Sequence, residues 1–264
     1  MTDTAYLALG WPQVALAGLL LLVNVGLSVA LRLGLAKTLL VAGARMTVQL
    51  VLVGLILEWV FALESPLPVL GIALVMATLA SVTAANRTRR RFRGIYWDSL
   101  LSVVTGSMVV TGVALAGVVR AEPWHDPQYI IPMLGMVLGN SLNGISLGLD
   151  RFTSTLYDRG ELINSRLALG ANRWEAARSE IREAIRTALV PTINSMLVMG
   201  VVSLPGMMTG QILAGAAPVD AVRYQMVIVF MIASAAALSS LGAILLAYRR
   251  LFNDRHQFLR HRLR

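Results

Sequence analysis

Residues 11–31, with the sequence WPQVALAGLLLLVNVGLSVAL, are apolar from end to end and carry no charged side chain. A helix needs about 20 such residues to cross a hydrocarbon core of roughly 30 Å. Apolar stretches of similar length recur along the chain, at 39–61, 67–85, 99–119, 129–149, 188–213 and 224–248. The sequence therefore predicts an all-α integral membrane protein with about seven transmembrane helices.

The composition of the whole chain agrees with several membrane spans. Of its 264 residues, 56% are hydrophobic and 14% are charged, and the mean hydropathy is +0.69. Soluble domains carry about 25% charged residues, so an ordinary soluble enzyme is excluded. The absence of cysteine excludes a disulfide scaffold, a thiolate metal site and a cysteine nucleophile. No domain boundary is visible, and we expect one transmembrane domain over residues 1–264.

The basic residues lie mainly in alternate connections between the apolar stretches, within 32–37, 87–93, 151–186 and 249–264. The other connections carry acidic residues, namely Asp3, Glu64, Glu122, Asp126 and Asp220. Because cytoplasmic loops are enriched in Lys and Arg, we expect the N-terminus outside, the C-terminus in the cytoplasm and a location in the cell inner (plasma) membrane. The net charge of +9 is therefore explained by basic loops that face the cytoplasm and its membrane lipid. We expect no nucleic acid as a partner.

The longest polar connection, about 151–187, predicts a helical unit on the cytoplasmic face. Asn172 is a good N-cap residue and Glu175 follows three positions later, as in a capping box, so a helix should begin there. Gly170 marks the end of a preceding helix. The expected apolar stripe of the new helix is Trp174, Ala177, Ile181 and Ile185, with Arg173, Arg178, Glu180, Arg182 and Glu183 on its other faces.

Two interpretations of this helix–turn–helix unit remain open on pattern alone. One is an amphipathic helix that lies on anionic lipid, and the other is a docking element for a cytoplasmic subunit. The run LGANRW at 169–174, followed by LVP at 189–191, resembles the cytoplasmic coupling loop of ABC-transporter permeases. The Glu-Ala-Ala triplet of that loop is replaced here by NSR at 164–166.

A closer resemblance covers nearly the whole chain. The strings ARMTVQL at 44–50, LGNS at 138–141 and SLPGMMTGQIL at 203–213 resemble the FetB family. These are small ABC permeases linked to bacterial iron export, with plant relatives linked to aluminium tolerance. The resemblance implies a single permease domain, a cytoplasmic ABC ATP-binding subunit as partner and a homodimer of this chain. It also implies that the ATPase-coupling residues are Gly170, Ala171, Asn172, Trp174 and Glu175.

The chain lacks a nucleotide site and a catalytic motif. Its one lysine, Lys37, does not stand in a phosphate-binding loop, so we expect ATP and magnesium on the partner subunit and no cofactor on this chain. The histidines, His125, His256 and His261, lie in an outer loop and the basic tail. No H-E-x-x-H or G-x-S-x-G motif occurs. We therefore expect a protein that is not an enzyme, and its metal ligands stay unknown at this point.

Polar residues inside the apolar stretches are candidates for a translocation path. Arg45 and Gln49 share one helical face; Arg45 is near enough to the inner end to snorkel, which indicates a structural role, whereas Gln49 is deeper. Asn140 and Asn143 predict either hydrogen bonds between helices or a polar wall of the path.

The sixth apolar stretch is the strongest candidate for the path. Pro205 and Gly206 should break its helix and free backbone carbonyls, which the membrane interior tolerates where they line a cavity or are buried in protein. The thioethers of Met207 and Met208 and the amide of Gln211 follow this break. Packing is the ordinary role of methionine, but thioethers and amide oxygens also bind metal ions.

The sequence thus predicts the transmembrane permease subunit of an ABC exporter, with iron or another metal ion as the substrate that the resemblance implies. One alternative is ABC export of a small polar organic molecule such as a nucleotide sugar. Another is an ion-coupled secondary transporter, which is disfavoured because no Asp or Glu lies deep in a span. The last is a membrane scaffold, with the cytoplasmic helix as a docking platform.

Overall fold

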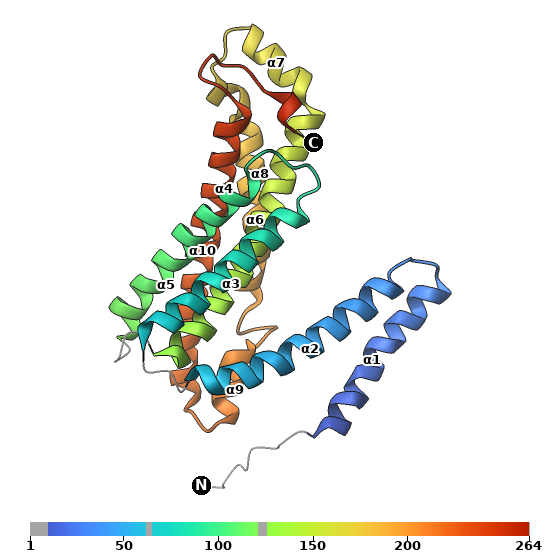
Figure 1. Cartoon of the computed structure of the whole chain (residues 1–264), viewed down its shortest axis with the longest axis vertical. Coiled ribbons are helices and arrows are strands. Elements are labelled where there is room, and N and C mark those ends of the chain that lie inside the picture. The colour runs from blue at the N-terminus through green and yellow to red at the C-terminus, as the bar shows by residue number, and fades with distance from the viewer. Residues whose placement is uncertain (1–9, 62–64, 121–125, 264) are drawn as a thin grey trace. The chain divides into compact units, whose positions relative to one another are not determined.

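The computed structural model describes residues 10–61, 65–120 and 126–263, and within these residues the regular structure is helical (Figure 1). The acidic residues Asp3, Glu64 and Glu122 and the imidazole of His125 lie outside the described residues. The helices are α1 Trp11–Ala30, α2 Ala36–Phe61, α3 Pro66–Arg87, α4 Ile95–Val103, α5 Val109–Val113, α6 Pro127–Asp158, α7 Gly160–Ala168, α8 Arg173–Val198, α9 Gly206–Leu213 and α10 Pro218–Leu251. The all-α prediction is confirmed for this part of the chain.

Six helical segments in the described residues are long and apolar enough to cross a membrane: Trp11–Ala30, Ala36–Phe61, Pro66–Arg87, Ile95–Val119, Pro127–Asp158 and Pro218–Leu251. They match six of the seven apolar stretches in the sequence. The expected span at 188–213 is instead divided between the end of α8, a non-helical connection and α9. This stretch is therefore not a single unbroken helix.

The helical segment Ile95–Val119 contains two π-helical turns, Val104–Met108 and Ala114–Val119. At Gly106 a Cβ atom would lie 2.2 Å from the Ser239 Oγ atom and 2.8 Å from the Ser239 backbone nitrogen. Because no side chain separates the two backbones there, the widened turn packs directly on α10. Such π-helical turns are rare and occur mostly as short bulges inside α-helices.

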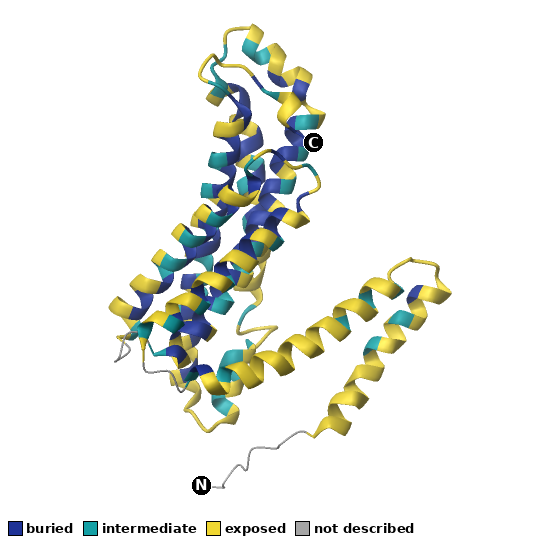
Figure 2. Ribbon diagram, in the orientation of Figure 1, coloured by how far each residue is buried: buried dark blue, intermediate teal, exposed yellow. Residues whose placement is uncertain are grey.

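The chain divides into two compact units, which we describe separately. The first contains the antiparallel pair α1 and α2, whose connection is closed by the Leu35 backbone nitrogen donating to Ser28 Oγ at 3.0 Å. Nearly all residues of both helices are exposed (Figure 2). Arg45 and Gln49 lie on exposed positions of α2 in this unit.

The second unit is built around α6, which packs on α3, α8 and α10. Figure 2 shows buried residues running along these helices. Small residues allow the close approach: a Cβ at Gly148 would lie 3.0 Å from both Ala188 Cβ and Ile244 Cδ1. This follows the usual pattern of helix packing in membranes, in which small residues bring backbones together.

The C-terminal segment after α10 folds back onto the unit that carries it. Phe252, Phe258 and Leu263 are buried, and the rings of Phe252 and Phe258 stack with their centroids 5.2 Å apart. Leu263 forms an isolated antiparallel bridge with Phe92, in the connection between α3 and α4. The basic tail that the sequence indicated is therefore an ordered cover over the polar end of the second unit.

Candidate functional site: a helical turn unit and a methionine-lined cavity

The connection between α7 and α8 is fixed by two capping motifs. The backbone nitrogens of Gly170 and Ala171 donate to the carbonyls of Leu167 and Arg166, each at 3.1 Å, which is the Schellman arrangement. Gly170 has a φ of +96°, and no atom lies within 4 Å of the position that a Cβ would take. Glycine is needed at this turn for its left-handed backbone and not for space.

The expected capping box at the start of α8 is confirmed. Asn172 Oδ1 accepts from the backbone nitrogens of Trp174 and Glu175 at 3.0 Å, and Glu175 Oε2 accepts from the Asn172 nitrogen at 2.9 Å. These bonds satisfy backbone donors that a helix N-terminus leaves free. Helix α8 then runs without a break for 26 residues, through Pro191, to Val198.

Two apolar side chains beside the turn differ in how far they are exposed. Trp174 packs edge-on against Tyr248 of α10, with ring centroids 5.7 Å apart, and keeps 44% of its surface exposed. Leu169 is 88% exposed at the turn itself. Leu169 is therefore the most exposed apolar side chain at the turn.

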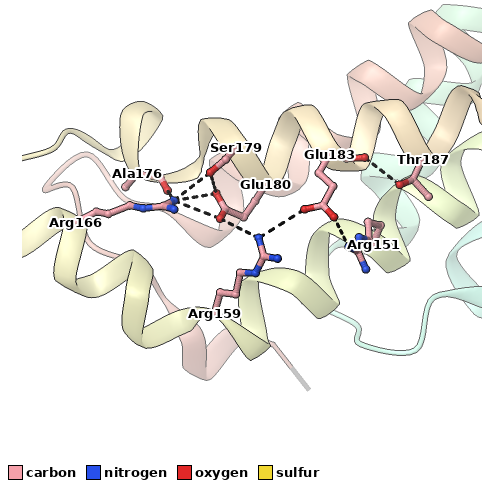
Figure 3. Close-up of polar contacts among 8 residues, drawn as sticks. All are labelled: Arg151, Arg159, Arg166, Ala176, Ser179, Glu180, Glu183 and Thr187. Atoms are coloured by element: carbon pink, nitrogen blue, oxygen red, sulfur yellow. Dashed lines mark hydrogen bonds and ion pairs between the residues drawn. The ribbon is translucent and has the colours of Figure 1, made fainter.

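A polar cluster joins α8 to α7 and to the end of α6 (Figure 3). The Glu180 side chain is fully enclosed and accepts from Arg166 Nη1 at 3.3 Å through both oxygens and from Ser179 Oγ at 2.7 Å. Arg159 Nη1 lies 4.0 Å from Glu180 Oε1 and 3.6 Å from Glu183 Oε2. These contacts tie α7 and the end of α6 to α8.

Glu183 lies one turn further along α8 and pairs with Arg151 of α6. The hydrogen bond from the Arg151 side chain holds the pKa of Glu183 below its ordinary value, against a smaller opposing effect of burial. A carboxylate that accepts from a guanidinium is favoured in its charged form.

The prediction that Glu180 lies on a face of α8 other than the apolar one is wrong. The buried side of the helix contains Ala176, Ala177, Glu180, Ile181, Ala184 and Ala188. Glu180 stands four positions from both Ala176 and Ala184, so the stripe of small residues could have revealed it. The carboxylate is tolerated there because two arginines of neighbouring segments face it.

A cavity of about 380 Å³ lies where α8 ends, lined by Met196, Met199, Gly200, Leu204, Pro205, Met208, Val222, Gln225, Met226, Val229 and Phe230. The helix breaks after Val198, upstream of the expected proline–glycine pair, and Gly200 takes a φ of +83°. Gly200 has no side chain, so it contributes only backbone to the lining. Its carbonyl accepts none of the backbone hydrogen bonds found between described residues outside the helices.

Gln225 of α10 is the polar side chain of this cavity. It is 8% exposed, and its Oε1 atom is buried and has no hydrogen-bond partner within the described part of the chain. A buried amide oxygen without a partner is uncommon because it loses its hydration without compensation. The sequence analysis missed Gln225, although it is the one amide at the start of the last apolar stretch.

The expected path residues do not all meet at this cavity. Pro205 and Met208 line it, whereas Met207 packs against the core formed by Val69 and its neighbours. Gln211 lies one turn beyond Met208 in α9, and its Oε1 is also buried without a partner in the described residues. Gly206 begins α9 and is exposed.

The two asparagines of α6 are bonded within the helical bundle. Asn143 Oδ1 accepts from Arg87 Nη1 of α3 at 2.9 Å, as hydrogen bonding between helices predicts. Asn140 Nδ2 donates to the Met136 carbonyl of its own helix at 2.9 Å. Neither residue lines the methionine-lined cavity.

The six long apolar helices and the broken seventh stretch define a multi-pass α-helical membrane protein. Comparison with known proteins also identifies its family. Residues 11–252 match the model of a family described as uncharacterised protein family UPF0014, and the chain belongs to that family. The expected FetB resemblance is thereby confirmed, and the family is one of membrane permeases.

Relatives come from bacteria and plants. The Synechocystis UPF0014 membrane protein slr1647 is 40% identical over 86% of this chain and 88% of its own. The probable iron export permease protein FetB of Escherichia coli is 33% identical over 94% of each chain. Protein ALUMINUM SENSITIVE 3 of Arabidopsis thaliana is 29% identical over 96% of this chain and 91% of its own. No solved structure matches the chain.

Proposed function

We propose that this chain is the permease subunit of an ABC exporter of iron or another metal ion. It acts as a homodimer in the inner membrane and is driven by a separate cytoplasmic subunit that binds ATP and magnesium. The E. coli relative, which is named a probable iron export permease and matches over 94% of both chains, supports the substrate.

The distribution of charge supports an orientation with the N-terminus outside and the C-terminus in the cytoplasm. The connection between α3 and α4 carries Arg89, Arg90, Arg91 and Arg93, and it lies with α7 at one end of the second unit (Figure 1). Asp126 and Asp220 begin helices at the opposite end. The last turns of α8 together with α9 then provide the seventh crossing, after a cytoplasmic coupling segment at about 151–187.

The observation that carries the proposal is the continuity of α8. One end of this helix holds the Asn172 cap and the Gly170 turn, and the other end supplies Met196 to the cavity. A helix of 26 residues is about 39 Å long at 1.5 Å per residue. A displacement of the turn by an ATP-binding subunit would therefore reach the cavity through a single rigid element, further fixed by Arg159 and Arg166.

We assign the contact with the ATP-binding subunit to the turn unit, formed by Leu169, Gly170, Ala171, Asn172, Trp174 and Glu175. Leu169 is the exposed apolar anchor, and Trp174 adds the half-exposed edge of its ring. A few residues near the centre of a protein interface, often tryptophan, supply most of its binding energy.

We assign the substrate path to the methionine-lined cavity. Four thioethers, from Met196, Met199, Met208 and Met226, surround it with the amide of Gln225. All of these donors are neutral, so they would bind a metal ion weakly and release it readily, as export requires. Gln211 would extend the path with its amide oxygen, which has no partner among the described residues. Gln49, Asn140 and Asn143 remain candidate path residues.

The size of the cavity favours a second candidate substrate. At about 380 Å³ it falls within the range of small-molecule sites and far exceeds a bare ion. A small polar organic molecule, or a metal ion that carries its own ligands, fits this volume. Among small polar organic molecules, we would test a nucleotide sugar.

The proposal is tested in cells that express the chain together with a candidate ATP-binding subunit and are loaded with radioactive iron. We expect ATP-dependent efflux, and co-purification of the two proteins, to fall in Leu169→Ala. The control is Leu162→Ala, because Leu162 is an exposed leucine within α7 that lies before the turn. If both variants behave as wild type, the turn does not couple the ATPase. If no metal ion leaves the cells but a nucleotide sugar stimulates ATP hydrolysis, the second substrate is correct.

A further inference from the structure

A basic cavity lies at the polar end of the second unit, between the α3–α4 connection and the C-terminal tail. Its volume is about 850 Å³, and its lining is Arg91, Phe92, Arg93, Ile95, Tyr96, Arg250, His261 and Arg262. The cavity unites segments that are more than 150 residues apart in the chain. We propose that it binds the headgroup of an anionic phospholipid from the inner leaflet.

The cavity has a fixed geometry. The bridge between Phe92 and Leu263 joins the two segments that carry its cations, and both residues are buried. Arg262 Nη1 donates to the Arg250 carbonyl at 2.9 Å. The hydroxyl of Tyr96 accepts from Arg91 Nη1 at 3.2 Å. The guanidinium groups of Arg91 and Arg262 are therefore held beside the cavity by contacts that do not involve acidic residues.

The charge of the lining is almost uncompensated. Asp98 is the only carboxylate that pairs with a lining arginine among the described residues, and it binds Arg250 through both oxygens at 2.5 and 2.8 Å. Arg91, Arg93 and Arg262 have no carboxylate partner in that part of the chain. Guanidinium groups gathered without counter-charges fit a phosphate, which they bind with two parallel hydrogen bonds.

The position of the cavity selects a lipid over a soluble anion. It lies where the spans Pro66–Arg87 and Pro218–Leu251 end and where Ile95–Val119 begins. The adjoining side chains of Tyr96 and Trp97 are 42% and 73% exposed, as in the aromatic belt of a membrane interface. Phe92 and Ile95 add apolar lining beside the arginines. Basic sites between helices at the cytoplasmic surface recognise anionic lipid headgroups.

The consequence concerns the tail and the start of α8. The tail also contacts Arg173, whose backbone nitrogen donates to His256 Nδ1 at 3.1 Å and whose Nη1 lies 2.6 Å from Asp254 Oδ1. A headgroup that bridges Arg93 and Arg262 would hold the tail against the proposed coupling helix. This inference rests on the orientation given under the proposed function, but it requires neither an exported substrate nor an ATPase.

The test measures lipid bound to the purified full-length chain by native mass spectrometry, with phosphatidylglycerol and phosphatidylcholine as probes. We expect tighter binding of phosphatidylglycerol and a loss of about thirtyfold in R93Q/R262Q, which removes one cation from each segment. The matched control R89Q/R255Q removes two exposed arginines that do not line the cavity. It should bind phosphatidylglycerol as the wild type does.

Three outcomes would overturn the proposal. One is an unchanged affinity for phosphatidylglycerol in R93Q/R262Q, and another is an equal loss in the control. The third is complete displacement of phosphatidylglycerol by millimolar inorganic phosphate, which would make this a site for a soluble anion. If R93Q/R262Q instead loses an ATP-binding subunit while it retains the lipid, the cavity is a protein contact. Since lipid binding is measured without ATP or metal, its failure leaves the export proposal untouched.

Discussion

Arg166 of α7 donates through one nitrogen to both carboxylate oxygens of Glu180 on α8, at 3.3 Å each, and the Glu180 side chain is fully enclosed. The two residues are 14 positions apart and lie on opposite sides of the Gly170 turn. Because the pair joins α7 to α8 across the turn, it opposes a change in the angle between the two helices.

Removal of Arg166 should destabilise the protein. The substitution Arg166→Leu leaves the Glu180 carboxylate with only Ser179 and the more distant Arg159, and an uncompensated buried charge costs about 3 kcal/mol of unfolding free energy. Arg182→Leu is the control, because Arg182 is exposed on α8 and forms no ion pair among the described residues. Thermal unfolding in detergent measures both variants.

The double variant Arg166→Leu/Glu180→Leu separates charge from packing. Replacement of a whole buried ion pair by apolar groups is often neutral, so the double variant should regain most of the stability lost by Arg166→Leu. A double variant as unstable as the single one would mean that the hydrogen bonds from Arg166 to Ser179 and the Ala176 carbonyl, and not the charge, hold the turn.

The ion pair between Arg151 and Glu183 predicts a dependence of stability on pH. In the folded protein the pKa of Glu183 is lowered from 4.5, chiefly by the hydrogen bond from Arg151. The pair therefore contributes to stability above the unfolded pKa of Glu183, and this contribution is lost as the pH falls through the folded pKa. Glu183→Gln should show a constant stability difference from wild type between pH 7 and about 5, and a smaller one below about pH 4. Both side chains are partly exposed, so the difference is under about 1 kcal/mol. Equal pH profiles would show that the pair does not persist in solution.

The apolar runs of the sequence predicted the membrane helices closely because apolar length directly reflects the thickness of the bilayer. The predicted run 11–31 became Trp11–Ala30, and 39–61 became Ala36–Phe61. Helix α4 begins four residues earlier than its apolar run and so includes Asp98, whose charge is paired with Arg250. That pairing spans 152 positions and leaves no local signal.

The site could be predicted where it depends on local chemistry. The Asn172 cap and the Gly170 turn follow from neighbouring residues, and both were expected. The small residues of α8 could have revealed the burial of Glu180. Its pairing with Arg166 and the contact of the tail with Phe92 depend on residues outside that helix, so its pattern could not reveal them. The break begins after Val198, upstream of the expected Pro205, because Gly200 takes the left-handed conformation.

The Gly170 turn provides a second functional test. A β-branched residue at φ +96° is strained, whereas asparagine tolerates the left-handed region, and no atom lies near enough to obstruct either side chain. Gly170→Val should cost about 1–2 kcal/mol and lower ATP-dependent efflux, and Gly170→Asn should keep both near wild type. Equal efflux from the two variants would exclude a role for the turn conformation in coupling.

The proposed orientation can be measured by cysteine labelling, because the chain has no cysteine of its own. An impermeant thiol reagent on intact cells should label Ser65→Cys and leave Ser179→Cys and Arg89→Cys unlabelled until the cells are opened. All three positions are exposed, whereas Thr88 is 2% exposed and would be protected on either side. Labelling at Arg89 with protection at Ser65 would reverse the topology.

At the methionine-lined cavity, an effect on iron efflux can be separated from an effect on stability. The Gln225 Oε1 atom has no partner in the described residues, so Gln225→Leu removes an unpaired buried polar group and should leave the unfolding temperature equal or higher. If the amide contacts the exported ion, the same substitution should lower iron efflux several-fold.

Two adjacent methionines supply the control for that experiment. Met208 lines the cavity, whereas Met207 packs in the apolar core with Val69 and Ile228. Met208→Leu should therefore lower efflux with little change in stability, and Met207→Leu should keep efflux, since leucine replaces methionine in a core at a cost below about 1.5 kcal/mol. Wild-type efflux from both Gln225→Leu and Met208→Leu would place the substrate elsewhere and leave these side chains with a packing role.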